Sequence, residues 1–244
     1  MIVLIFFAFH WYTSLFIQSF FHHRYAAHRQ FTMSPVWEKF FYVCSFLTQG
    51  SSYISPYAYG VMHRLHHMHT DTMHDPHSPV ISPGFFTLLW NTRNYYYSTY
   101  SGKTSVEDKV KKDIPNWHAF DAVAHNWISR MGWIVGYTLF YVFFATNWWL
   151  FLLLPLTVIM ASLQGAIVNW WAHKFGYVTY VMKNESKNIL PVDLFFMGEA
   201  YHNNHHKYPG RLKNAHRWFE IDPTYCFIWC MNKLKIIRTD RTTY

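Results

Sequence analysis

Apolar residues are concentrated in two long blocks of this chain that contain no Lys, Arg, Asp or Glu. The first block covers residues 1–21, and the second covers residues 131–171 with a turn-like Thr146-Asn147 inside it. About 20 helical residues cross a bilayer core of about 30 Å. The first block therefore predicts one membrane span, and the second predicts a hairpin of two. A secretory signal peptide is the rival interpretation of the first block, which however lacks a basic n-region and a clear cleavage site.

A third uncharged segment, residues 40–59, is less apolar and contains Gly50 and Pro56 among several serines. One full crossing here would put the histidines before and after it on opposite membrane faces, too far apart to share a site. We therefore expect a bent, re-entrant helical segment whose polar backbone is buried by protein. Residues 106–112 read as a short cytosolic helix, and residues 117–133 as an amphipathic interfacial segment.

Charge is distributed asymmetrically along the 244 residues. There are 21 Lys and Arg against 13 Asp and Glu, and all 21 cations lie outside the two apolar blocks, ten from Arg24 to Arg130 and eleven after Trp171. This positive-inside pattern predicts an N-terminus outside the cell and a cytoplasmic middle and C-terminal part. The basic face would meet anionic lipid headgroups or an acidic protein rather than nucleic acid. Three cysteines without a C-x-x-C pair give no disulfide framework.

Together these patterns predict one all-α integral membrane domain over residues 1–244. It would have about three transmembrane helices, a re-entrant or amphipathic segment and a cytosolic helical cap.

Histidine is in large excess, with 17 residues, and three groups of them have regular spacing. The groups are His23 and His28 (H-x₄-H), His63, His66 and His67 (H-x₂-H-H), and His202, His205 and His206 (H-x₂-H-H). Residues i, i+3 and i+4 share one helix face, so each H-x₂-H-H should present three imidazoles to a single point. Residues five apart lie about 140° apart on an ideal helix. His23 and His28 can therefore converge only where the helix ends or unwinds.

Eight histidines in three such groups exceed what one metal ion can take, so they predict two metal ions. Neutral imidazole suits Fe, Zn, Cu and Ni, and the spacing alone leaves the metal open. No group contains a Cys, which argues against an Fe–S cluster or structural zinc. Outside these groups, ordinary interior or surface positions are expected for His10, His22, His69, His118, His125 and His216. His74 and His77, on either side of Asp75-Pro76, should fix a loop or support ligands.

The chain resembles the membrane fatty acid desaturases and, within them, the stearoyl-CoA (Δ9) branch. The resemblance covers about residues 5–235. It is carried by the order of the histidine groups, residues 198–209 (GEAYHNNHHKYP), residues 74–77 (HDPH), residues 84–86 (GFF) and residues 169–173 (NWWAH), which resemble the family's N-x-x-A-H segment.

The resemblance implies an all-nitrogen di-iron site with nine histidine ligands. They would be His23, His28, His63, His66, His67, His173, His202, His205 and His206. It also implies that Asn169 holds a metal-bound water. Ligating histidines need acceptors for their second N–H, and the candidates are Asp71, Asp75, Asp193 and Glu199.

The reaction implied by the resemblance uses O₂ and two external electrons to introduce a cis double bond, at Δ9, into a saturated acyl chain. A di-iron fatty acid hydroxylase or alkane monooxygenase shares the histidine groups and is the alternative, although residues 198–209 favour desaturation. A histidine-rich metal transporter would carry ionisable residues along its spans, and these spans have almost none.

Two departures from the resemblance concern the acyl carrier. Val61-Met62 stands where acyl-CoA members have Arg-Asp, and Ser82-Pro83 stands where they have Arg-Arg. Coenzyme A, acyl carrier protein and an intact lipid therefore all stay open as carriers. The chain begins at what resembles the second transmembrane helix of those members. It has no fused cytochrome b₅-like domain, so we expect a separate electron donor such as cytochrome b₅ or a ferredoxin.

Helix geometry suggests where an acyl tunnel would end. At a rise of 1.5 Å per residue, Leu15 lies about 12 Å from His23 along the helix and Trp11 about 18 Å. The methyl-side half of a bent acyl chain needs about 12 Å. Leu15 and Trp11 are therefore predicted to close the tunnel and set chain length, with packing against lipid or neighbouring helices as the alternative.

Overall fold

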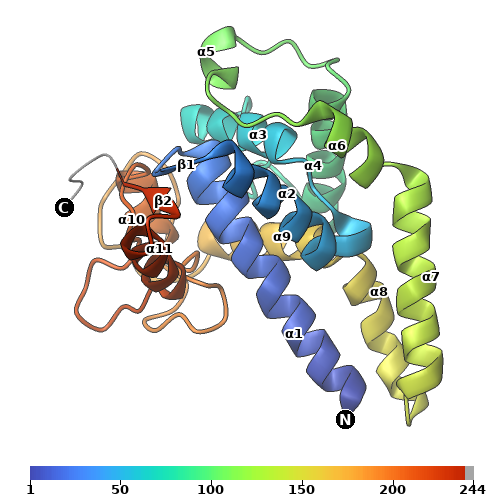
Figure 1. Ribbon diagram of the computed structural model, residues 1–244. Helices are drawn as coiled ribbons and strands as arrows, with labels where there is room; N and C mark the ends of the chain where they lie inside the picture. Colours follow the sequence, from blue (N-terminus) through green and yellow to red (C-terminus); the bar gives the residue numbers. More distant parts are fainter. Residues whose placement is uncertain (240–244) are drawn as a thin grey trace.

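The computed structural model describes residues 1–239, and its fold is built almost entirely of helices (Figure 1). Helix α1 (Ile2–Ile17) continues without a break into the π-helix η1 (Gln18–Ala27). The helical elements that follow are α2 (Pro35–Gln49), η2 (Gly50–Ser52), α3 (Pro56–His69), α4 (Phe85–Tyr100), α5 (Asp108–Lys111), α6 (His118–Ala124), α7 (Trp127–Phe144), η3 (Trp148–Leu152), α8 (Leu153–Val158), α9 (Met160–Ala172), α10 (His202–Lys207) and α11 (Pro223–Lys233). One pair of two-residue strands, β1 (Thr32–Met33) and β2 (Ile237–Arg238), is antiparallel.

Three helices start at a capping residue followed by proline. Ser34, Ser55 and Asp222 accept hydrogen bonds from backbone N–H groups in the first turns of α2, α3 and α11, and a proline follows each of them. The side-chain oxygen satisfies an N–H that has no partner within the helix, and proline has the backbone angle that a first helical turn needs. These boundaries are therefore fixed locally.

Fewer helices are long and apolar enough to cross a membrane than the sequence pattern predicts. Within the described residues, one helix, Ile2–Ala27, is long and apolar enough to cross a bilayer. A second candidate is Trp148–Val158 with Met160–Ala172, a pair bent by 77°. The second apolar block does turn after Phe144, close to Thr146-Asn147, but α7 itself is not among the candidates. One or two spans are supported, and the count of three stays a prediction.

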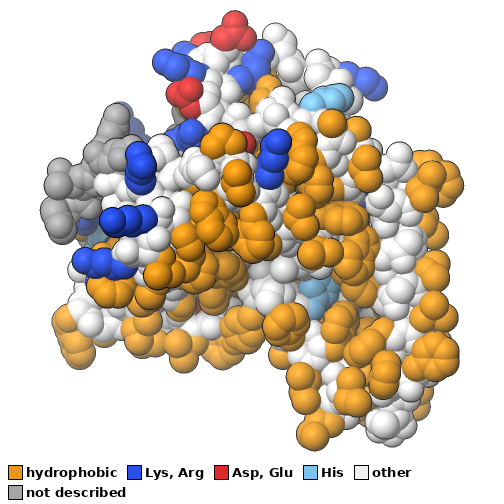
Figure 2. All heavy atoms as spheres, viewed as in Figure 1, with side chains coloured by type: hydrophobic (Ala, Val, Ile, Leu, Met, Phe, Trp, Pro, Cys, Tyr) orange, Lys and Arg blue, Asp and Glu red, His pale blue; other side chains and the backbone are white. Residues whose placement is uncertain are grey.

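The surface separates by chemistry along the long axis of α1. In Figure 2 hydrophobic side chains cover the lower part of the molecule, over the start of α1 and the lower end of α7, while Lys, Arg, Asp and Glu gather toward the top and left. Exposed apolar side chains of these two helices include Ile5, Phe9, Leu139 and Phe143. This division is the one expected of a protein partly embedded in lipid.

The uncharged segment at residues 40–59 reverses direction, as expected for a re-entrant segment. Helix α2 packs against α1, the chain turns at Gly50, and α3 returns to pack against η1. Gly50 has φ +52°, and a Cβ there would lie 1.8 Å from the hydroxyl of Tyr137, so the turn requires glycine. The reversal brings His63 to His28, with 2.9 Å between their Nε2 atoms.

The loop between α9 and α10 holds the third histidine group in place. Asp193 accepts hydrogen bonds from the backbone N–H groups of Phe195, Phe196, Gly198 and Ala200. The expectation that Asp193 supports a ligating histidine is therefore wrong, because both of its oxygens are engaged by this turn. Asp193 instead fixes the backbone that leads into α10.

Candidate metal centre

The first histidine pair converges because the helix widens. Residues Gln18–Ala27 form a π-helix, in which the N–H of His28 donates to the carbonyl of His23 at 3.1 Å. Bonding from i to i+5 stacks residues five apart, so the two imidazole rings lie 4.8 Å apart between centroids. The local unwinding that the H-x₄-H spacing requires is thus a π-helical segment rather than a helix end.

The nine histidines predicted from the sequence come together in two adjacent clusters. We name them cluster A (His23, His28, His63, His67 and His205) and cluster B (His66, His173, His202 and His206). The ring centroids of His67 and His206 are 4.3 Å apart across the boundary between the clusters. All nine positions therefore contribute to one continuous centre.

The expectation that each H-x₂-H-H points at a single metal is wrong. Helix α3 gives His63 and His67 to cluster A and His66 to cluster B, whereas α10 gives His202 and His206 to cluster B and His205 to cluster A. Residues four apart differ by about 40° around the helix axis, whereas the residue at i+3 lies about 60° from the first of them on the other side and about 100° from the second. Each motif therefore supplies two ligands to one cluster and one to the other.

The nitrogen spacing fits a metal ion in each cluster. Ligands about 2.1 Å from an ion and at right angles to one another lie about 3.0 Å apart. The measured Nε2–Nε2 distances are 3.0 Å for His23–His205, 2.9 Å for His28–His63, 3.0 Å for His67–His205, 3.2 Å for His66–His206, 3.1 Å for His173–His202 and 3.0 Å for His202–His206.

Carboxylates lie next to the outer ring nitrogens of three clustered histidines. Nδ1 of His66 lies 2.9 Å from Asp75, Nδ1 of His173 lies 2.9 Å from Asp71, and Nδ1 of His23 lies 2.7 Å from Glu199. An Nδ1–H directed at a carboxylate leaves the lone pair on Nε2 facing the cluster. Asp71, Asp75 and Glu199 thus occupy the supporting positions expected of them.

Burial favours the neutral form of seven of the clustered imidazoles. It lowers the pKa of His28, His63, His66, His67, His202, His205 and His206, and positive charge on neighbouring histidines lowers each of them further. The pKa of His67 falls to about 3. Neutral imidazole is the form that binds a metal ion, so these seven histidines are in their ligating form at neutral pH.

Asn169 and His77 lie next to cluster B. Asn169 is on the same face of α9 as His173, four residues on; its amide N–H donates to the carbonyl of His77, and its oxygen is buried without a partner. The ring of His77 lies 4.5 Å from that of His66, and His66, Asp75 and His77 could together hold an ion. An unpartnered amide oxygen beside the cluster is consistent with a bound water, and that role of Asn169 stays a prediction.

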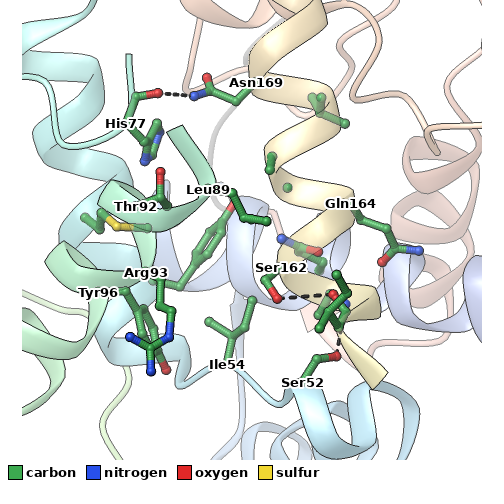
Figure 3. A pocket seen from close by; sticks show the side chains of 18 of the residues that line it. Ser52, Ile54, His77, Leu89, Thr92, Arg93, Tyr96, Ser162, Gln164 and Asn169 are labelled. Carbon is green, nitrogen blue, oxygen red and sulfur yellow. Dashed lines mark hydrogen bonds between the residues drawn. The ribbon is translucent and has the colours of Figure 1, made fainter. Parts of the chain in front are cut away.

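A cavity of about 370 Å³ extends from the histidines between α1, α4 and α9. Figure 3 shows part of its wall, with His77 and Asn169 at one end and Ile54, Ser162 and Gln164 toward the other. Leu15 lines this cavity, and its role in closing the tunnel stays a prediction. Trp11 is not among the lining residues; it lies close to the C-terminal part, with its ring N–H directed at the carbonyl of Phe195. The placement of Trp11 at the end of the tunnel stays a prediction that this lining does not support.

Two residues that the sequence did not single out support the site, the buried Arg24 and the half-buried Tyr59. Arg24, next to His23, pairs with Asp222 at 2.9 Å and lies 3.6 Å from Glu199, so it ties η1 to the start of α11. Tyr59 stacks on His63, with 5.5 Å between ring centroids. An arginine just beyond the end of the first apolar block, next to His23, was the one signal that could have pointed to Arg24.

Comparison with known proteins agrees with this geometry. A sequence model of the fatty acid desaturase family matches residues 1–224. The Delta-9 desaturase-like 5 protein of Arabidopsis thaliana is 31% identical over 227 residues, which are 88% of this chain and 69% of that protein. The sn-1 stearoyl-lipid 9-desaturase of Synechocystis sp. is 28% identical, and the match covers 88% of this chain and 64% of that protein. Delta-9 acyl-lipid desaturase 1 of Arabidopsis thaliana is 29% identical, and the match covers 85% of this chain and 65% of that protein. The chain thus spans about two thirds of the length of these relatives. Because the family model matches residues 1–224, most of the chain, this protein is a member of the fatty acid desaturase family.

Proposed function

We propose that this protein is an O₂-dependent desaturase that introduces a cis double bond at the Δ9 position of a saturated acyl chain held on a membrane lipid. The observation that carries the proposal is an apolar-walled cavity that ends against two histidine clusters. The wall combines metal-cluster residues such as His63 and His66 with apolar side chains such as Leu15, Leu88 and Val168. An acyl chain in this cavity would place its middle carbons beside the centre.

Cluster A and cluster B would each hold one iron ion. Cluster A offers five nitrogens, and cluster B offers four together with the unpartnered oxygen of Asn169 next to it. When bound, the iron would supply the oxidising power that, with O₂ and two electrons, removes hydrogen from an unactivated methylene. The all-nitrogen donor set, free of thiolate, is compatible with iron.

The protein's own residues would position the chain and keep water out. Tyr59 and Met62 on α3 and Leu88 and Leu89 on α4 line the cavity on the side of the clusters. A rigid wall that excludes water would hold one pair of neighbouring methylenes at the metal centre. The position of the acyl chain in the cavity would therefore determine which carbons react. Carbons further toward the methyl end would lie toward Leu15.

Two observations favour a lipid over coenzyme A as the acyl carrier. Met62, in the position where acyl-CoA members of the family have an acidic residue, lines the cavity without charge. The names of two relatives describe acyl-lipid enzymes, sn-1 stearoyl-lipid 9-desaturase and Delta-9 acyl-lipid desaturase 1. We extend that substrate class to this chain.

The proposed orientation follows the distribution of charge. The N-terminus would lie outside, and the histidine clusters would face the cytoplasm with the Lys and Arg residues. A separate electron donor, such as cytochrome b₅ or a ferredoxin, would supply the two electrons. A donor with an acidic surface would suit the basic face.

Gas chromatography–mass spectrometry of the fatty acids of an expressing host tests the proposal. A new Δ9-monounsaturated acid should appear with the wild-type chain, disappear in His205→Ala and persist in His69→Ala. His69 is the matched control, because it is the last residue of the histidine-bearing helix α3 but belongs to neither cluster. A hydroxylated acid would instead identify the hydroxylase alternative. No product after co-expression of both kinds of electron donor would contradict the desaturase assignment.

A further inference from the structure

The wall of the cavity contains two arginines, and they differ in how many hydrogen bonds their guanidinium N–H groups donate within the protein. Arg130 donates to the carbonyls of Ser51, Tyr53 and His125. Arg93 is exposed and makes one side-chain hydrogen bond, to Asn94 at 3.3 Å. Over residues 1–239 no carboxylate forms a salt bridge with Arg93. Since a guanidinium has five N–H donors, most of those on Arg93 are free to bind a ligand.

Aromatic rings on the same helix hold the Arg93 guanidinium in position. It lies 5.2 Å from the ring centre of Trp90 and 4.7 Å from that of Tyr97. Cation–π contacts of this kind orient the guanidinium without using its N–H groups. The side chain is therefore already ordered for a ligand, which reduces the entropy lost on binding.

Arg93 lies at the opposite part of the cavity wall from the metal centre. Figure 3 shows Leu89 and Thr92 between the His77–Asn169 pair and Arg93, with Tyr96 beside the guanidinium. A chain lying along this wall would have its reacting carbons near the histidines and its polar end near Arg93.

The exposed face of α4 indicates the surroundings of Arg93. Phe86, Trp90 and Tyr97 are exposed by 82%, 60% and 38%. Exposed Trp and Tyr are typical of the level of lipid headgroups, where an arginine also extends its charge toward the polar layer. This part of the cavity would then open among headgroups rather than into bulk water.

We propose that Arg93 binds the phosphate of a glycerophospholipid whose acyl chain occupies the cavity, and so selects phospholipid as the substrate. The inference rests on the proposed function of the cavity and adds the headgroup chemistry. A single free cation matches the single negative charge of a phosphodiester, whereas coenzyme A carries several phosphate charges for which this wall offers no further free cation. Arginine suits the role because its planar fork pairs with two phosphate oxygens.

Lipid binding by the purified full chain in detergent tests the proposal. The probe is a fluorescent phosphatidylglycerol, displaced by distearoyl phosphatidylglycerol, by distearoylglycerol, which has the same chains and no phosphate, or by stearoyl-CoA. A charge-assisted contact predicts that the wild type binds distearoyl phosphatidylglycerol at least about 10-fold more tightly than distearoylglycerol. Arg93→Gln should remove that preference, and Arg93→Lys should keep part of it.

Arg217→Gln is the matched control. Arg217 is also an exposed arginine over aromatic rings, those of Tyr177 and Phe219, and it does not line the cavity. This control should keep the full preference, and Arg93→Gln should keep the wild-type melting temperature because its side chain is exposed.

Three results would overturn the proposal: no phosphate preference in the wild type, an unchanged preference in Arg93→Gln, or tighter binding of stearoyl-CoA that depends on Arg93. Because binding needs no iron, O₂ or electron donor, a failure of desaturation would leave this result standing. Absence of the phosphate preference in the wild type, with desaturation intact, would count against the Arg93 inference alone.

Discussion

Substitution of the Asp75 carboxylate is the sharpest test of whether the protein supports the metal ion of cluster B separately from that of cluster A. Its Oδ1 accepts from the N–H of His77 at 3.0 Å, its Oδ2 accepts from the N–H of Asp71 at 2.9 Å, and both oxygens face Nδ1 of His66. The side chain is fully buried. Asp75→Asn replaces one oxygen by an NH₂ group with almost no change of volume.

Either orientation of the new amide places a donor against a backbone N–H. One buried N–H then loses its partner, which costs about 1–3 kcal/mol, or about 5- to 150-fold in an equilibrium constant. Loss of a carboxylate behind a ligating histidine typically costs about 10- to 100-fold in metal affinity. The two estimates overlap, so we expect cluster B to bind its ion about 10- to 100-fold more weakly.

Metal content after dialysis against graded concentrations of chelator, measured by mass spectrometry, provides the assay. Wild type should retain two ions, and Asp75→Asn should lose one of them at a much lower chelator concentration and keep the other, because His66 belongs to cluster B alone. Asp108→Asn is the control, since Asp108 is fully exposed and belongs to neither cluster. Equal retention of both ions by Asp75→Asn, or loss of both together, would refute the reasoning.

Three further predictions concern the tunnel, the buried ion pair and pH. Leu15→Ala should shift products toward longer chains, by roughly 10- to 200-fold in preference per methylene, whereas Trp11→Ala should leave the gas-chromatographic profile unchanged; the reverse pattern would contradict the cavity assignment. Arg24→Met should lower stability by about 3–5 kcal/mol because Asp222 is left as an unpaired buried charge, and Arg24→Met with Asp222→Asn should recover part of the lost melting temperature; no recovery would count against the pair. Burial lowers the pKa of His125 from 6.5 to about 3, so the unfolded chain binds more protons and stability is lost progressively as pH falls from about 6.5 toward 3. His125→Gln should flatten this dependence in melting curves recorded across pH, and identical slopes would show that His125 does not contribute.

Most of the centre was predictable because its chemistry is local in sequence. Spacings of three and four residues put imidazoles on one side of a helix whatever the rest of the fold does. His173 is different, since it stands alone in the sequence and was assigned only through the resemblance to the desaturases. Its pairing with Asp71, 102 residues away, depends on the packing of α9 against the loop after α3.

The sequence alone determined the class of fold, the family and the nine histidines. Residue type and short spacing carry that information, and long uncharged blocks exclude an ordinary soluble domain. Only the tertiary structure decided how the histidines divide, because the crossing of α3 and α10 sends His66 and His205 to the cluster opposite their neighbours. It also decided that Leu15 faces the cavity and Trp11 does not, and that Asp193 serves a turn while Asp75 serves a ligand. Those outcomes depend on contacts between segments far apart in the chain, whose geometry no local pattern specifies.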